Sequence, residues 1–344
     1  MNEKGERLMK QKDAFDLTKY CLAILVVAIH TELAPGVLYP WLRLAVPLFF
    51  ILSSYILFAK INGVSDDYQK KVHIKRFVKR NLQLYAFWFV ILLPITVLVH
   101  KEWFAAGWTG VRITVTQLLF SSTFVASWYI IGSVWAVFIL YALRKVDWRI
   151  LMVFFLMIYV FCCFRSGYYT ISSKSRMVIK LYQHYECVFT CPVLSFPIAS
   201  FWMFLGKLFA DHESLKGHTK LWLIGILLSS IGLFLEWKVM VSYGARVSSD
   251  LFFFLAPLSV CIFAMIKEIN ISLKYAKLLR TISVIMFPLH ASLARVFSYV
   301  ASTRIKKNYP LINFLIIIII CHITTILILK LEKRKHFSIL KYSH

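Results

Sequence analysis

The chain alternates long apolar stretches with short polar ones along its whole length. A helix needs about 20 mostly apolar residues to cross a bilayer, and ten stretches approach or reach that length. The pattern therefore predicts an all-α, polytopic integral membrane helix bundle with about ten transmembrane helices. The predicted spans are Leu17–Ala34, Leu44–Ala59, Leu82–His100, Trp128–Leu143, Ile150–Phe164, Leu194–Ala210, Leu221–Val241, Leu251–Ile266, Leu278–Val300 and Leu311–Leu329.

The distribution of basic residues predicts the orientation of these spans, because lysine and arginine are enriched in cytoplasmic loops. With the amino terminus inside, the inner segments hold about twice as many lysines and arginines as the outer ones. A further apolar segment, Val111–Val125, is a candidate eleventh or re-entrant span, but an eleventh span would place the basic tail outside. We therefore predict one membrane domain over residues 1–344, with a cytoplasmic amino-terminal segment (1–15) and a cytoplasmic carboxyl-terminal tail (331–344).

The composition is typical of a membrane protein and argues against a nucleic-acid-binding protein. The chain has 344 residues, of which 60% are hydrophobic, and its mean hydropathy is +0.71. The net charge of +24 would suggest nucleic acid in a soluble protein, but cytoplasmic loops explain it here. The amino terminus has no short apolar core followed by a small-residue cleavage site, so we expect no removable signal peptide. We expect a multi-pass protein of the cytoplasmic (cell) membrane.

One predicted outer loop, Cys163–Val193, is unusually long and basic. Loops of this length are either functional or disordered. It either holds an anionic glycan or lipid headgroup, or is a solvated linker. Cys187 and Cys191 lie one helical turn apart within it, with no histidine at ligand spacing, so we expect neither a disulfide nor a metal site there.

The first predicted span carries two ionisable residues, Lys19 and His30, eleven positions apart. Eleven residues make three helical turns plus about 20°, so both side chains share one helix face, about 16 Å apart along the axis. Ionisable groups inside a membrane are costly and are functional candidates by default. A neutral imidazole can take a proton from an attacking hydroxyl and return it to a leaving group. His30 is therefore a candidate general base, and a helix-packing histidine is the alternative.

Six short motifs follow one another along the chain. They are Asp16–Lys19 with Val26–Thr31, Val46–Tyr55, Arg76–Tyr85, Ser127–Ile130, Ser195–Lys207 and Ser283–His290. In this order, over roughly residues 13–330, they resemble the acyltransferase-3 family of integral membrane O-acyltransferases. The similarity is to the branch that includes the membrane domains of glycopeptide-resistance serine or alanine racemases. The chain departs from the family pattern at Lys19, Ser54 and Ala126, where arginine, glycine and histidine are usual.

The resemblance implies an O-acyltransferase, most simply an O-acetyltransferase. It would transfer an acyl group from cytoplasmic acyl-coenzyme A to a hydroxyl of a cell-envelope glycan or lipid-linked sugar. His30 and Lys19 would be the catalytic residues. Lys19, with Arg76, Lys79 and Arg80 on the same predicted side, would bind the polyanionic donor, because a lysine binds phosphate as a point charge. Lys19 snorkelling to the interface or pairing with Asp16 is the alternative, and a positive-inside signal is the alternative for the other three.

Several further polar groups are candidates for the same cavity, without a fixed role. They are Asp16, Trp128, Tyr129, Glu236, Asp250 and His290. Glu32 lies two residues after His30 and would face about 200° away on a continuing helix, so we expect it to be a poor partner for His30. Acetyl-coenzyme A or another acyl-coenzyme A is expected as a cosubstrate, with no resident cofactor and no metal.

Two other functions remain open from the sequence. A polytopic transporter or exporter would move a small molecule or acyl group without acylating a glycan, although no internal repeat or paired broken helices point to one. An inactive relative acting as an assembly subunit would explain the departures at Lys19, Ser54 and Ala126.

Overall fold

The computed structural model describes residues 3–33, 36–124, 126–212, 218–300 and 310–344. In this part of the chain the regular structure is helical throughout, with no β-strand. The elements are α1 (Glu3–His30), η1 (Gly36–Leu38), α2 (Tyr39–Leu42), α3 (Ala45–Asn62), α4 (Asp67–Val99), α5 (Lys101–Ala105), α6 (Gly107–Phe120), α7 (Trp128–Ala142), α8 (Trp148–Phe164), α9 (Tyr169–Ser172), α10 (Arg176–Val188), η2 (Pro192–Leu194), α11 (Phe196–Asp211), α12 (Thr219–Ser242), α13 (Leu255–Glu268), α14 (Ala276–Val300), α16 (Pro310–Leu331) and η4 (Lys335–Ser343).

Each of the ten apolar stretches lies on one of the long helices, so the helical prediction is confirmed for all ten. Ala34, the last residue of the first predicted span, lies outside the described residues. By length and composition, five of the described segments can cross a membrane: Gly36–Asn62, Asp67–Val99, Thr219–Ser242, Ala276–Ser298 and Pro310–Leu331. The helices α7 and α8 are apolar but shorter. Ten spans and two cytoplasmic termini therefore stay predictions.

Apolar side chains cover the outside of the bundle as well as its core. On α12 and α16 they form long exposed rows, which include Leu221, Leu223, Ile224, Leu227, Leu228, Ile231, Leu311, Ile312, Leu315, Ile319 and Ile323. Soluble proteins rarely expose contiguous apolar surface of this extent, which marks a membrane-facing surface instead. These rows identify the lipid-facing sides of α12 and α16.

The centre of the bundle depends on a close approach of α3 and α11. Gly206 of α11 lies so near α3 that an added Cβ would be 2.2 Å from the carbonyl oxygen of Ile51. The Oγ of Ser54, which is fully buried, donates a hydrogen bond to the carbonyl oxygen of Met203. Small residues of this kind let transmembrane helices pack backbone to backbone. Ser54, which stands where glycine is usual, is therefore accommodated by a small residue on the facing helix.

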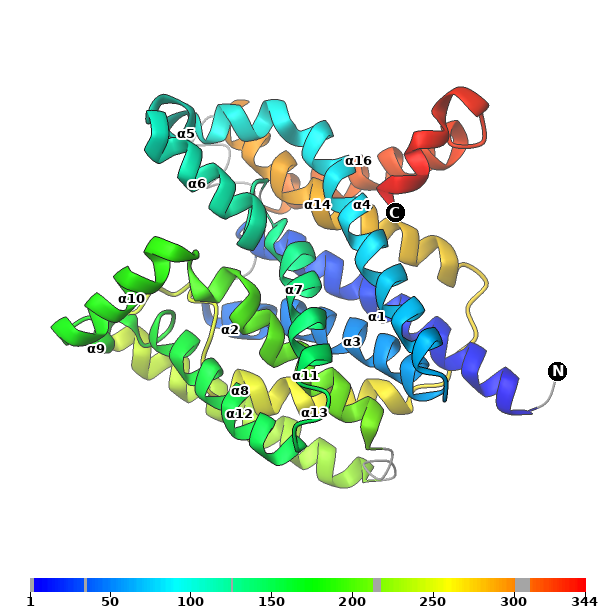
Figure 1. Cartoon of the computed structure of the whole chain (residues 1–344), viewed down its shortest axis with the longest axis horizontal. Coiled ribbons are helices and arrows are strands. Elements are labelled where there is room, and N and C mark those ends of the chain that lie inside the picture. Colours follow the sequence, from blue (N-terminus) through cyan, green and yellow to red (C-terminus); the bar gives the residue numbers. More distant parts are fainter. Residues whose placement is uncertain (1–2, 34–35, 125, 213–217, 301–309) are drawn as a thin grey trace.

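The segments predicted to be extracytoplasmic lie together in the structure. Figure 1 shows α5, α6, α9 and α10 on the side of the bundle away from the amino terminus. The candidate eleventh or re-entrant span is helical as far as the end of α6 at Phe120, and its last residue, Val125, lies outside the described residues. The long basic loop contains α9 and α10. That loop is packed: Arg165 pairs with Glu186 (Nε to Oε1, 2.7 Å), and the hydroxyl of Tyr182 donates to the carbonyl of Phe161 (2.8 Å). A solvated linker would not make these contacts.

We expect the substitution Gly206→Leu to separate α3 from α11 and to destabilise the fold. Overpacking a tight core typically costs about 1–3 kcal/mol, and here the obstacle is backbone that cannot move aside. Gly63→Ala is the control, because an added Cβ there meets nothing closer than 3.6 Å. Thermal unfolding in detergent should show a clearly lowered midpoint for Gly206→Leu and little change for Gly63→Ala. Equal midpoints for the two variants would mean that this helix contact does not limit stability.

Candidate functional site

A polar cavity of about 830 Å³ lies where α1 ends, on the side of the bundle predicted to be the outer one. This volume is within the range of small-molecule sites. Side chains from α1, α2, α7 and the connecting loops line it, and those that matter most are His30, Glu32, Arg43, Trp128, Tyr129 and Asp250. Four residues predicted from the sequence (His30, Trp128, Tyr129 and Asp250) thus meet in one cavity.

His30 is the last residue of α1 and is exposed into this cavity. Behind it, the ring of His290 on α14 lies with its centroid 5.0 Å from that of His30. His290 is 1% exposed and is not among the lining residues. The structure therefore brings the two predicted histidines together, with His30 facing the cavity and His290 buried behind it.

An ion pair at the cavity connects the end of α2 to the loop before α13. A guanidinium nitrogen of Arg43 (Nη1) lies 2.5 Å from Oδ1 of Asp250. The other terminal nitrogen donates to the hydroxyl of Tyr39 (3.1 Å) and to the carbonyl of Ser248. Arg43 is mostly buried, with a side-chain exposure of 16%. The pair fixes the loop that carries Asp250 against the helical segment that carries Arg43.

Two residues of the cavity wall have a strained backbone. Among the described residues, Glu32 (φ +53°) and Ala126 (φ +72°) are the only non-glycine residues with positive φ, and both line the cavity. A side chain in this region costs about 1–2 kcal/mol, so such residues cluster where the surrounding structure imposes them. The helix assumed in placing Glu32 ends at His30, and both side chains line the same cavity. That Glu32 is a poor partner for His30 stays a prediction.

Charged side chains gather around Lys19, which lies near the middle of α1, eleven residues before His30. Asp16 is 4% exposed, and its Oδ2 lies 3.4 Å from Nη1 of Arg280 on α14. Lys19 is half-buried and lies within electrostatic range of Asp16, Arg80 and Arg280. Of the three basic residues predicted on α4, Arg80 belongs to this cluster. Arg76 and Lys79 lie exposed on the same helix.

Tyr129 links this basic cluster to the cavity. It lines the cavity, its hydroxyl lies 2.8 Å from Oγ of Ser53, and it is within electrostatic range of Arg80. Its ring packs against Phe50 and Phe287, with centroids 4.4 Å and 4.9 Å away. An aromatic group thus stands where the charged cluster and the cavity approach each other.

Besides His290, two of the predicted cavity residues do not line the cavity. Asp16 belongs to the charged cluster described above and not to the cavity lining. Glu236 accepts hydrogen bonds from the hydroxyl of Tyr168 and from the backbone N–H groups of Phe253 and Phe254 (2.6 Å and 2.9 Å). Those two N–H groups precede α13, so Glu236 holds the start of that helix, as a capping carboxylate does.

Sequence reasoning missed several residues of the site. Arg43, His100, Arg295 and Asn313 line the cavity, and Arg280 pairs with Asp16. None lies in a short motif, and they are spread over several parts of the chain, with Arg280 and Arg295 both on α14. The sequence did hold one signal for Arg43 and Arg295, which is their position at the predicted outer ends of spans. Basic residues are usually enriched on the cytoplasmic side, so a basic residue at an outer end is unusual.

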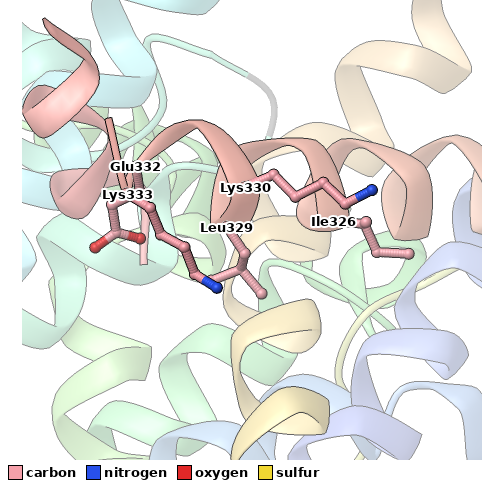
Figure 2. A pocket seen from close by; sticks show the side chains of 5 residues that line it. All are labelled: Ile326, Leu329, Lys330, Glu332 and Lys333. Atoms are coloured by element: carbon pink, nitrogen blue, oxygen red, sulfur yellow. The ribbon is translucent and has the colours of Figure 1, made fainter. Parts of the chain in front are cut away.

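A second hollow lies at the end of α16 and is lined by Ile326, Leu329, Lys330, Glu332 and Lys333 (Figure 2). All five side chains project from one helix end, and the charged ones suit a membrane surface. In the described ranges, no group of three or more histidine, cysteine, aspartate or glutamate residues is arranged to hold a metal ion. The cysteines Cys187 and Cys191 form no disulfide. The polar cavity is therefore the candidate site.

These features define a multi-pass membrane protein, an all-α bundle with a histidine-bearing cavity. Comparison with known families identifies it further: a family model described as an acyltransferase domain matches residues 12–331. The chain belongs to this acyltransferase-3 family, and its membrane acyltransferase character follows.

One curated relative, an amino-acid racemase from Enterococcus faecalis, is 23% identical over 183 residues. The match covers 49% of this chain and 25% of the relative, so the chain spans only a part of that protein. This similarity agrees with the racemase-associated branch that the motifs resemble. No solved structure matches the chain.

We expect Ala126→Gly to stabilise the protein by about 0.5–1 kcal/mol, because glycine adopts positive φ without a steric cost. Thermal unfolding in detergent measures this change. Ala106→Gly is the control: Ala106 has φ −89°, so glycine there only adds freedom to the unfolded chain and should lower stability. A lower midpoint for both variants would show that the backbone at Ala126 is not strained.

Proposed function

We propose that this chain is a membrane O-acyltransferase, specifically an O-acetyltransferase. Its donor is cytoplasmic acetyl-coenzyme A or another acyl-coenzyme A, and its acceptor is a hydroxyl of an extracytoplasmic glycan or lipid-linked sugar. The observation that carries the proposal is the placement of His30. It faces a polar cavity at the end of α1, while Lys19 lies in a basic cluster eleven residues earlier on the same helix.

The basic cluster suits the donor. Coenzyme A is polyanionic, and Lys19, Arg80 and Arg280 offer three cations within a small region, with Asp16 as an acidic neighbour. Charge-assisted hydrogen bonds to phosphate are about twice as strong as neutral ones. We assign donor binding to Lys19 and Arg80, with Arg76 and Lys79 extending the basic surface of α4. We add Arg280 to this set, because it lies in the same cluster as Lys19.

The cavity suits the acceptor and the reaction. The acceptor hydroxyl attacks the thioester carbonyl carbon, the new C–O bond forms, and the C–S bond to coenzyme A breaks. His30 takes the hydroxyl proton and returns it to the departing thiolate, so protons and electrons balance. Transfer through an acyl group carried briefly on His30 leads to the same products. Trp128, Tyr129 and the Arg43–Asp250 pair offer aromatic faces and hydrogen-bonding groups of the kind that hold a sugar.

The proposal includes a topology. A cytoplasmic donor and an extracytoplasmic acceptor require Lys19 near the inner surface and His30 towards the outer one. This orientation follows if both termini are cytoplasmic and ten helices cross the cell membrane. The grouping of α5, α6, α9 and α10 away from the amino terminus supports it (Figure 1).

We predict that His30→Ala abolishes transfer and leaves expression unchanged, because the cavity-facing imidazole is the proton acceptor. Membranes holding each variant are incubated with radiolabelled acetyl-coenzyme A and extracted envelope glycans. Label that mild base releases from the glycan measures O-acetylation. His184→Ala is the control, because His184 is an exposed histidine on α10 that bonds only to its own helix at Lys180.

Each outcome of this assay decides between alternatives. Label with wild type and His184→Ala but not with His30→Ala supports the proposal. Equal label with all three removes His30 from the mechanism. No label with any of them, together with coenzyme-independent flux through liposomes containing the protein, favours a transporter.

We predict that Lys19→Met raises the KM for acyl-coenzyme A about 10- to 100-fold, the range expected for losing a hydrogen bond to a charged group. Lys19→Arg keeps the charge and should stay within a few-fold of wild type. Lys174→Met is the control, since Lys174 is exposed on the predicted outer loop. An unchanged KM in Lys19→Met would remove Lys19 from donor binding.

A further inference from the structure

His290 is a buried histidine with one bonded ring nitrogen and one unbonded ring nitrogen. Its Nδ1 lies 2.9 Å from the carbonyl oxygen of Met286, one turn earlier on α14. Its Nε2 is buried and has no hydrogen-bond partner among the described residues. Buried polar atoms are nearly always satisfied, so an exception of this kind calls for a physical reason.

The hydrogen bond at Nδ1 of His290 determines whether Nε2 of the same ring is a donor or an acceptor. A carbonyl oxygen only accepts, so Nδ1–H of His290 donates to Met286. In a neutral imidazole the second nitrogen then carries a lone pair and is an acceptor. Nε2 of His290 is therefore an acceptor without a donor among the described residues. The hydrogen bond from Nδ1–H to the carbonyl of Met286 holds the ring in place.

The imidazole ring that contains this acceptor lies against the ring of His30. The two ring centroids are 5.0 Å apart and the ring planes are inclined by 57°. His30 is exposed to the cavity, whereas His290 is not among its lining residues. A substrate in the cavity therefore reaches His30 first, and Nε2 of His290 is placed to act through His30.

We propose that His290 is a positioning residue for His30, on the basis of the proposed acyl transfer. Nε2 of His290 accepts a hydrogen bond from the ring N–H of His30 that faces α14. This bond selects one tautomer of His30, in which the cavity-facing nitrogen carries the lone pair. That nitrogen takes the hydroxyl proton, and His290 keeps its own proton on Nδ1 throughout. A base oriented by a third group is the general logic of activated nucleophiles.

The same contact also has a role after proton transfer. When His30 holds the hydroxyl proton, both of its nitrogens are donors and its ring is positively charged. The lone pair of His290 then faces an N–H of a cation, and hydrogen bonds to charged groups are the stronger class. His290 thus favours the state that forms during the reaction over the resting state.

The kinetic experiment compares His290→Gln with His290→Leu in the purified full-length protein. Glutamine places an acceptor oxygen near the position of Nε2, whereas leucine fills the space without an acceptor. We expect His290→Leu to lower kcat about 10- to 100-fold, the usual effect of losing such a partner, with the KM for acyl-coenzyme A within twofold. His290→Gln should recover most of the lost kcat.

His322→Leu is the matched control. His322 on α16 also bonds its own helix through Nδ1, at the carbonyl of Ile318 (2.8 Å), and its Nε2 lies 3.0 Å from the hydroxyl of Tyr20. A general structural effect of losing a helix-bound histidine would appear in this variant too. Wild-type kcat in a folded His290→Leu, or an equal loss in His290→Gln and His290→Leu, would overturn the proposal.

A second measurement does not need activity. Nitrogen-15 NMR of histidine-labelled protein reports the tautomer of each ring, and the His30 signals are assigned by their absence in His30→Ala. We expect a single His30 tautomer in wild type and a mixture in His290→Leu; the same mixture in both would overturn the proposal. If wild type transfers no label, the proposed function fails, while this spectrum still tests the contact between the two histidines.

Discussion

The contact between α1 and α14 is the constraint on which the rest of the site depends. Asp16 is almost fully buried, and a buried carboxylate is tolerated only when a cation neutralises it. Arg280 provides that cation, which fixes how α14 lies along α1. The axial distance from Asp16 to His30 is about 21 Å and that from Arg280 to His290 about 15 Å. The difference is about the reach of an arginine side chain, so the ion pair at one end is compatible with the histidine pair at the other.

Departures from ordinary protein structure concentrate at the cavity. Both non-glycine residues with positive φ in the described ranges line it. The described ranges also contain five buried side-chain nitrogen or oxygen atoms without a hydrogen-bond partner. Two of them belong to the lining residues Arg43 and Asn313, and a third belongs to His290, beside His30. The bundle elsewhere follows the usual rules, with small residues at helix contacts and apolar rows towards lipid. Local violations of this kind are expected where a site is stabilised by the structure around it.

The sequence predicts helices well and the site in part, for physical reasons. The thickness of the bilayer determines how long an apolar stretch must be to cross it as a helix, so each predicted span lies on a helix. His30 and Lys19 are predictable because a helix fixes their relative position. The place of Glu32 in the cavity lining was not predictable in this way, because that reasoning assumes a continuing helix and α1 ends two residues earlier. Glu236 was placed in the cavity because its sequence position shows the end of a span, but not the unpaired N–H groups before α13 that it satisfies.

Two of the residues that sequence reasoning missed, Arg43 and Arg280, have partners that are distant in the chain. Arg43 meets Asp250, and Arg280 meets Asp16, across more than 200 positions. No local pattern encodes such a pair, because each member alone is an ordinary charged residue near a membrane surface. Tyr129 shows the same limit. Its position in a short motif is visible in the sequence, but its place between Arg80 and the cavity follows only from how α4 packs against α7. A donor held at the basic cluster and an acceptor held near His30 would meet at this tyrosine, which makes the packing of those two helices as important to the proposed chemistry as the histidine itself.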